Sequence, residues 1–111
     1  MAYKKWDVIL VSFPFTDLKA SKKRPALIIS PNEYNLKADV IITFITSKMD
    51  QDYKTGDYHI KEWKSVNLPK PSMIRMKFAT IDKTIIQNRL GRLSESDANN
   101  FKKELIAFFD R

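Results

Sequence analysis

The stretch from Phe13 to Ser30, FPFTDLKASKKRPALIIS, predicts the end of one strand, a polar and basic loop, and the start of a second strand. Pro14 ends the first strand because proline cannot donate to a ladder. Pro25 fixes its own φ and holds Arg24 in an extended conformation at the entrance of the second strand. A guanidinium held in this way is suited to a bidentate contact with a phosphate.

Short apolar runs on both sides of this stretch predict further strands. The runs are rich in β-branched residues and are separated by turn residues. The connections between them are too short for βαβ crossovers, so we expect an antiparallel arrangement. The expected strands are Trp6–Ser12, Pro25–Ser30, Asp39–Ile45, Tyr58–Ile60, Ser72–Asp82 and Ile85–Leu90.

The run Ser72–Asp82 alternates between two faces. Because successive side chains of a strand point to opposite sides, Arg75 and Lys77 share one face. We expect the other face to lie against the core; its members are Ile74, Met76, Phe78 and Thr80. This interpretation leaves two cations side by side on the outer face.

A long helix is predicted over Ser94–Phe109. Ser94 is a good N-cap, and Asp97 three residues later resembles a capping box. Several short strands followed by one helix favour a mainly β protein, built as a small antiparallel barrel or a strongly bent sheet. The length of 111 residues indicates a single domain, 1–111.

The composition narrows the classes of function. Lysine and arginine total 20 against 13 acidic residues, and the resulting net charge of +7 favours a polyanionic partner such as nucleic acid, an acidic protein segment or an anionic membrane surface. There is no cysteine and one histidine, which excludes thiolate and multi-histidine metal sites. No leader peptide or apolar run of about 20 residues is visible, so we expect a cytoplasmic protein without a membrane segment.

Several blocks of the sequence, in this order, resemble the MazF/PemK toxins. The blocks are Asp7–Val11, Phe13–Asp17, Lys22–Ser30, Thr80–Asp82 and Gly91–Ser94. The resemblance implies a small SH3-like barrel of the CcdB/PemK type with a C-terminal helix, usually a homodimer. It also implies a sequence-specific, metal-independent endoribonuclease without a cofactor. Its partners would be single-stranded RNA and a cognate antitoxin with an acidic, flexible tail.

The resemblance also assigns roles to residues. It makes Arg24 and Thr46 the catalytic residues, with Ser47 next to Thr46. The basic residues themselves predict a groove for RNA, so the expected RNA-binding residues are Lys22, Lys23, Ser47, Lys48, Arg75 and Lys77. The chain departs from the family at Trp6, where glycine is common, and at Lys77, where some members carry a glutamine that reads RNA.

The chemistry of such a site follows from the residues it contains. Without a metal, the 2′-hydroxyl of the RNA can be the nucleophile, and the products are a 2′,3′-cyclic phosphate and a 5′-hydroxyl. Arg24 can stabilise the charged phosphorane, while Thr46 or Ser47 holds an oxygen. The general base stays open: Asp17 and His59 are candidates, and Trp63 is a candidate for stacking on a base.

One alternative keeps the same fold without chemistry. The chain could be a non-catalytic binding module, either a CcdB-like toxin that binds a protein or an inactive relative. The presence of both Arg24 and Thr46 favours the enzyme.

Overall fold

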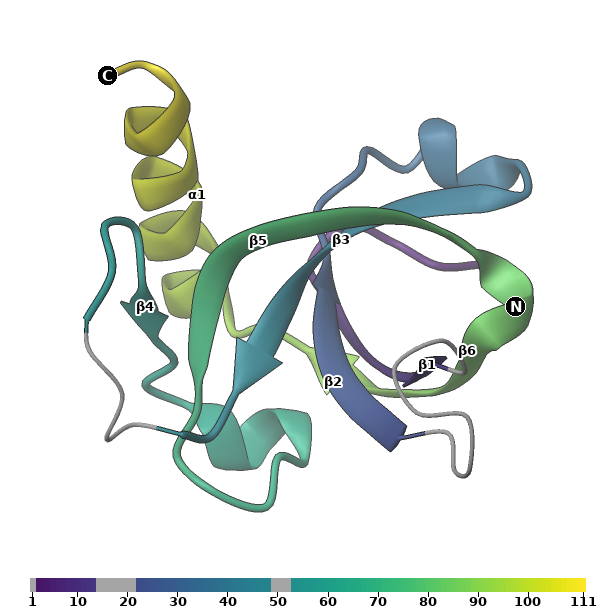
Figure 1. Cartoon of the computed structure of the whole chain (residues 1–111), viewed down its shortest axis with the longest axis horizontal. Coiled ribbons are helices and arrows are strands. Elements are labelled where there is room, and N and C mark those ends of the chain that lie inside the picture. The colour runs from purple at the N-terminus through teal and green to yellow at the C-terminus, as the bar shows by residue number, and fades with distance from the viewer. Residues whose placement is uncertain (1, 14–21, 49–52) are drawn as a thin grey trace.

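A computed structural model describes residues 2–13, 22–48 and 53–111. In this part of the chain, an antiparallel sheet of six strands in the order β4-β5-β3-β2-β1-β6 stands beside a C-terminal helix (Figure 1). The strands are β1 (Asp7–Phe13), β2 (Lys22–Ile28), β3 (Asp39–Thr46), β4 (Tyr58–His59), β5 (Met73–Asp82) and β6 (Ile86–Arg92), and the helix is α1 (Glu95–Phe109). Short 3₁₀ helices are η1 (Tyr34–Leu36), η2 (Trp63–Val66) and η3 (Lys83–Ile85). The mainly β fold with a C-terminal helix is thus confirmed.

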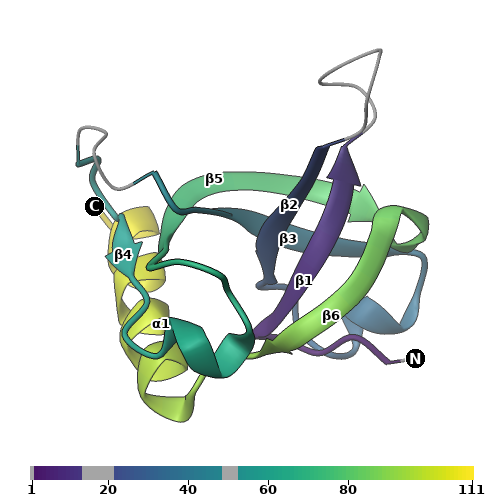
Figure 2. The ribbon, with the colours of Figure 1, turned by 90° about the horizontal axis from the view of Figure 1, so that it is seen from below.

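The sheet curls into a barrel that is not closed. Figure 2, seen from below, shows β5, β3, β2, β1 and β6 wrapping around, with α1 to one side. The strand order leaves β4 and β6 as the two edges of the described sheet. β2 begins at Lys22, three residues before the predicted start at Pro25. β2 pairs with β3 only from Ala26 onward. The residue before it, Pro25, has no N–H to donate to the neighbouring strand.

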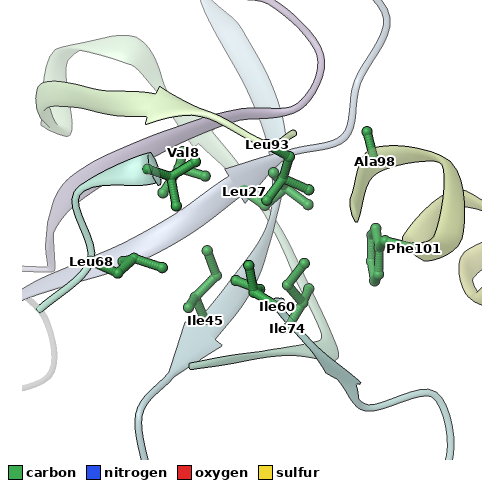
Figure 3. Packing of buried hydrophobic residues seen from close by; sticks show 10 residues of the cluster. Val8, Leu27, Ile45, Ile60, Leu68, Ile74, Leu93, Ala98 and Phe101 are labelled. Atoms are coloured by element: carbon green, nitrogen blue, oxygen red, sulfur yellow. The ribbon is translucent and has the colours of Figure 1, made fainter. Parts of the chain in front are cut away.

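Buried apolar residues form two clusters, one on each face of the curled sheet. The sheet core is built from the strands and consists of Ile9, Val11, Ala26, Ile28, Val40, Ile42, Ile81 and Ile86. The helix core lies between the sheet, η2 and α1 and consists of Val8, Leu27, Ile45, Ile60, Val66, Leu68, Ile74, Leu93, Ala98 and Phe101 (Figure 3). Neighbouring positions on one strand therefore serve different cores, as alternation requires.

The prediction that one face of β5 alone lies against the core is wrong. Ile74 belongs to the helix core, whereas Ile81 from the other face belongs to the sheet core. The strand crosses from one core to the other along its length, so each end buries a different face. Thr80, expected in the core, is exposed.

A bulge in β5 lies at this crossing. Ile45 pairs with Ile74 and Thr43 pairs with Phe78, so the β5 residues 75–77 stand opposite the single β3 residue 44. The Thr43 hydroxyl donates to the Arg75 carbonyl and lies 3.3 Å from the Lys77 carbonyl. A bulge of this kind bends a strand and re-aims its side chains.

Helix α1 begins as predicted, with Ser94 as its N-cap; the Ser94 hydroxyl accepts from the Asp97 N–H at 3.1 Å. The Asp97 carboxylate also accepts hydrogen bonds that a capping box does not include. It accepts the Tyr58 hydroxyl at 2.7 Å and the N–H groups of Lys61 and Glu62 at 3.1 and 2.9 Å. The start of α1 is therefore tied to the segment that follows β4.

These contacts perturb two pKa values. Burial alone would raise the pKa of Asp97, but the donors of Tyr58, Glu62, Lys61 and Ser94 outweigh it, so the pKa lies below 3.8. Burial, followed by the hydrogen bond to the Asp97 carboxylate and its charge, raises the pKa of Tyr58 to about 12.

Trp6, at a position where the resemblance noted above leads one to expect glycine, has a φ of +76°. This conformation is unfavourable for a residue with a side chain. The indole ring packs edge-on against Phe101 with ring centroids 6.1 Å apart. The backbone of Trp6 is also held at both sides, because its N–H donates to Ile28 and its carbonyl accepts from Leu93. Packing and backbone bonds thus offset the strain.

Candidate nucleic-acid interface

Arg24 and Thr46 lie on either side of the place where β2 and β3 separate. The two strands pair from Ile28↔Ile42 to Ala26↔Phe44 and then diverge (Figure 1). Arg24 is two residues before Ala26, and Thr46 is two residues after Phe44. A continued ladder would therefore make Arg24 and Thr46 direct partners. We call the place where the backbones of β2 and β3 separate (Figure 1) the opening.

The same two side chains belong to one face of the sheet. Arg24 pairs with Val11, which lies in the sheet core, and Phe44 packs against that core from β3. Strand alternation therefore places Arg24 and Thr46 at the rim of the sheet core. Arg24 is exposed and Thr46 is half-buried. The Thr46 hydroxyl accepts from the Lys48 N–H at 3.2 Å, which orders the turn after β3.

Lys77 stands at the same rim. It is exposed, and its ammonium lies 6.0 Å from the centroid of the Phe44 ring. The β5 bulge sets this position, because Lys77 is one of the residues opposite Phe44. Sequence reasoning missed both Phe44 and Thr43, which looked like ordinary members of an apolar strand. No local pattern marks a bulge whose partner is more than thirty residues away.

Arg75 shares a face of β5 with Lys77 but not its surroundings. The Arg75 side chain is 14% exposed, and its Nη2 lies 3.6 Å from Oδ2 of Asp57, whose side chain is 1% exposed. The sequence pattern indicated two equivalent cations; the structure shows one exposed cation and one that is paired and largely buried.

The remaining candidate residues differ in how much of them the structure describes. Lys23 is exposed on β2, but alternation turns it to the face opposite Arg24. Ser47 and Lys48 are exposed just beyond the end of β3. Lys22 is the first residue of β2, and its side chain lies outside the described part, as does all of Asp17.

His59 and Trp63 have different surroundings. Met73 pairs with His59 on one side and with Thr46 on the other, so the three form one row across the sheet. Two strand spacings separate His59 from Thr46, about 10 Å. Trp63 is half-buried against the helix core, and the Lys64 ammonium lies 5.4 Å from its ring centroid. Trp63 therefore serves packing in this structure.

The described residues contain no group of three histidine, cysteine, aspartate or glutamate side chains placed to hold a metal ion. None of their helices has the length and apolar character needed to cross a membrane.

Comparison with protein families identifies the class. The model of the PemK-like, MazF-like toxins of type II toxin–antitoxin systems matches residues 4–109. The chain therefore belongs to this family. No curated protein sequence matches it significantly.

Solved structures share the fold. An endoribonuclease in complex with its cognate antitoxin, from a mycobacterial species, is 18% identical with a TM-score of 0.76, covering 96% of this chain and 93% of the other. The Mycobacterium tuberculosis toxin MazF-mt6 is 17% identical with a TM-score of 0.74, covering 94% and 96%. A MazE–MazF structure from Deinococcus radiodurans is 13% identical with a TM-score of 0.75, covering 99% and 98%.

Proposed function

We propose that this chain is a single toxin domain, residues 1–111, that cleaves single-stranded RNA at short sequences without a metal ion. Family membership supports the toxin class, and two of the similar structures bear the name endoribonuclease. The observation that carries the proposal is the placement of Arg24 and Thr46. They stand at the same end and on the same face of the sheet, on two sides of one opening.

The mechanism uses the 2′-hydroxyl of the substrate. This oxygen attacks the adjacent phosphorus, the bond to the 5′-oxygen of the next nucleotide breaks, and a 2′,3′-cyclic phosphate forms. The 2′-hydroxyl loses its proton, and the leaving 5′-oxygen gains one. The Arg24 guanidinium neutralises the charge that develops on the phosphorane, and the Thr46 hydroxyl holds an oxygen of the reacting group. Arginine does not deprotonate in proteins, so Arg24 is not the base.

Surrounding cations would bind the RNA backbone on both sides of the cleaved bond. Lys77, at the position where some relatives carry a glutamine, would contact a base or phosphate above Phe44. Arg75 is a further phosphate ligand next to this opening. The remaining candidates for RNA contacts are the cations Lys22, Lys23 and Lys48 and the hydroxyl residue Ser47, which lie at the ends of β2 and β3.

The partners follow from the same class. A cognate antitoxin with an acidic, flexible tail would cover the cationic opening, since carboxylates can replace phosphates on arginine and lysine. Structures of relatives include complexes with antitoxins. We further propose a homodimer that acts in the cytoplasm.

The main experiment incubates the purified protein with a long unstructured RNA in EDTA and maps the ends of the fragments. We expect cleavage at a short recurring sequence, with 2′,3′-cyclic phosphate and 5′-hydroxyl ends. Intact RNA, or cleavage that needs Mg²⁺, would contradict the mechanism. Intact RNA together with binding that does not respond to salt would favour the protein-binding alternative.

A second experiment separates Arg24 from His59 as catalytic groups. Arg24→Ala should abolish most of the cleavage, because it removes the charge opposite the phosphorane. His59→Ala should leave most of it, since His59 lies about two strand spacings from Thr46. The reverse result would reassign the catalytic role to His59.

A further inference from the structure

Asp57 stands beside Arg75 at the edge of the sheet. β4 and β5 pair Tyr58 with Ile74 and His59 with Met73, and continuing this register by one residue places Asp57 opposite Arg75. The carboxylate and the guanidinium lie 3.6 Å apart. Both side chains are shielded from solvent, and Asp57 more so.

The two partners are not equally satisfied. Asp57 accepts the backbone N–H of Lys54 at 2.8 Å. Nε and Nη2 of Arg75 are buried, and neither has a hydrogen-bond partner among the residues that the structure describes. The 3.6 Å separation from Asp57 exceeds the 2.7–2.9 Å or so of a charge-assisted hydrogen bond. Buried donors without acceptors are unfavourable, so a better acceptor would stabilise Arg75.

Arg75 is also close to the opening between β2 and β3. Thr46 pairs with Met73, and Arg75 is two residues beyond Met73 on the same face of β5. In a regular ladder, diagonal neighbours of this kind lie about 7–8 Å apart between their backbones, and Arg75 is the first residue of the bulge that follows. The guanidinium of Arg75 can therefore serve the phosphate next to the one that Arg24 and Thr46 would hold.

We propose that Arg75 binds this second RNA phosphate and that Asp57 occupies the guanidinium in the free protein until the phosphate displaces it. The proposal rests on the ribonuclease function proposed above. Carboxylate and phosphate compete for the same planar donor fork. Asp57 keeps its bond to Lys54 after the exchange, while Arg75 gains acceptors for its unsatisfied donors. Asp57 thereby limits the affinity of the site for RNA.

The test measures binding of a fluorescent 2′-O-methyl oligoribonucleotide, which lacks the attacking hydroxyl, by anisotropy over a range of salt. Asp57→Asn should bind about threefold to tenfold more tightly than the wild type, as expected from removing one competing charge. The amide oxygen of the variant can still accept the Lys54 N–H. The double variant Asp57→Asn/Arg75→Gln should lose this gain, and its slope of log K against log salt should fall by about 0.7.

Asp82→Asn is the matched control. Asp82 accepts the Thr84 N–H at 2.8 Å and lies at the other end of β5, so the change in charge and the backbone contact are equivalent. It should bind like the wild type. If Asp57→Asn and Asp82→Asn raise the affinity for the oligonucleotide equally, the gain comes from net charge alone, and the proposal is overturned. Weaker binding by Asp57→Asn would also overturn it, because Asp57 would then help Arg75 to bind.

A second variant covers the case in which Asp57→Asn does not fold, as judged by thermal unfolding. Arg75→Lys keeps the charge but lacks the planar fork, and it should bind the oligonucleotide about threefold more weakly at an unchanged salt slope. Unchanged affinity would overturn the role of Arg75. If the wild type neither binds this oligonucleotide nor cleaves RNA, the ribonuclease function fails as well; if it does both, only the Asp57–Arg75 proposal is at stake.

Discussion

Two regions of the molecule hold charge in opposite ways: the start of α1, called here the helix end, and the opening between β2 and β3. At the helix end, the Asp97 carboxylate is fully buried, and four donors of the protein bind it. At the opening between β2 and β3, Arg24 is exposed and Lys77 extends over an aromatic ring. A buried charge must be satisfied by the protein itself, whereas an exposed cation stays available for an anionic ligand. The helix end therefore stabilises the fold, and the opening is where binding is expected.

The largest expected effect is the loss of cleavage in Arg24→Ala, by about a hundredfold to a thousandfold in rate. Its stability should change by less than about 0.5 kcal/mol, because Arg24 is exposed. Rate and thermal unfolding are measured on the same sample. The control is Arg92→Ala, an exposed arginine of β6 that stands opposite Asp7 in the ladder, at the other end of β1. Equal loss of cleavage in both variants would show a general charge effect.

Removal of the Asp97 carboxylate at the helix end should change the stability of the fold. Asp97→Ala leaves the N–H groups of Lys61 and Glu62 without their acceptor and should lower the free energy of unfolding by about 3 kcal/mol. Denaturant unfolding measures this. Asp110→Ala removes a carboxylate from the other end of α1, where it is exposed, and should change stability by less than about 0.5 kcal/mol. A small effect of Asp97→Ala would contradict the division between the two regions.

The pH dependence of stability tests the same contacts with a smaller effect. The pKa of Asp97 is lowered in the fold, so its contribution is present above its ordinary value of 3.8 and is lost as pH falls through the folded value. The pKa of Tyr58 is raised from 10.0 to about 12, so its contribution is present below 10.0 and is lost as pH rises through about 12.

Denaturant unfolding across pH checks this window. Asp97→Asn should flatten the acid side of the stability curve, and Tyr58→Phe should flatten the alkaline side. If each variant keeps the wild-type slope on its own side, the Tyr58–Asp97 contact does not shift these pKa values.

The smallest expected effect concerns the bulge that links the two cores. Thr43→Val removes the hydroxyl that binds the Arg75 carbonyl and should cost about 1 kcal/mol of stability. Cleavage should also fall severalfold, because the bulge positions Lys77. Thr80→Val changes an exposed threonine of β5 in the same way and should leave both quantities near the wild type. Normal cleavage by Thr43→Val would separate the bulge from the site.

Much of the fold could be predicted because its signals are local. Apolar runs located the strands, and Ser94 located the start of α1. Arg24 could be singled out because a proline acts on the residue before it. The pairing between distant strands has no such local signal. This is why the burial of β5 was predicted for one face, although the strand serves two cores.

The local sequence was enough to predict the β-rich class, the C-terminal helix, the excess of positive charge, and Arg24 and Thr46 as residues near strand ends. The folded structure adds that the two lie on either side of the place where β2 and β3 separate, because the register of these strands sets their relation. It likewise decided that Asp57 covers Arg75 and that Trp6 takes a positive φ. These features depend on contacts between segments far apart in the chain, and alternation within a single strand carries no information about its partner.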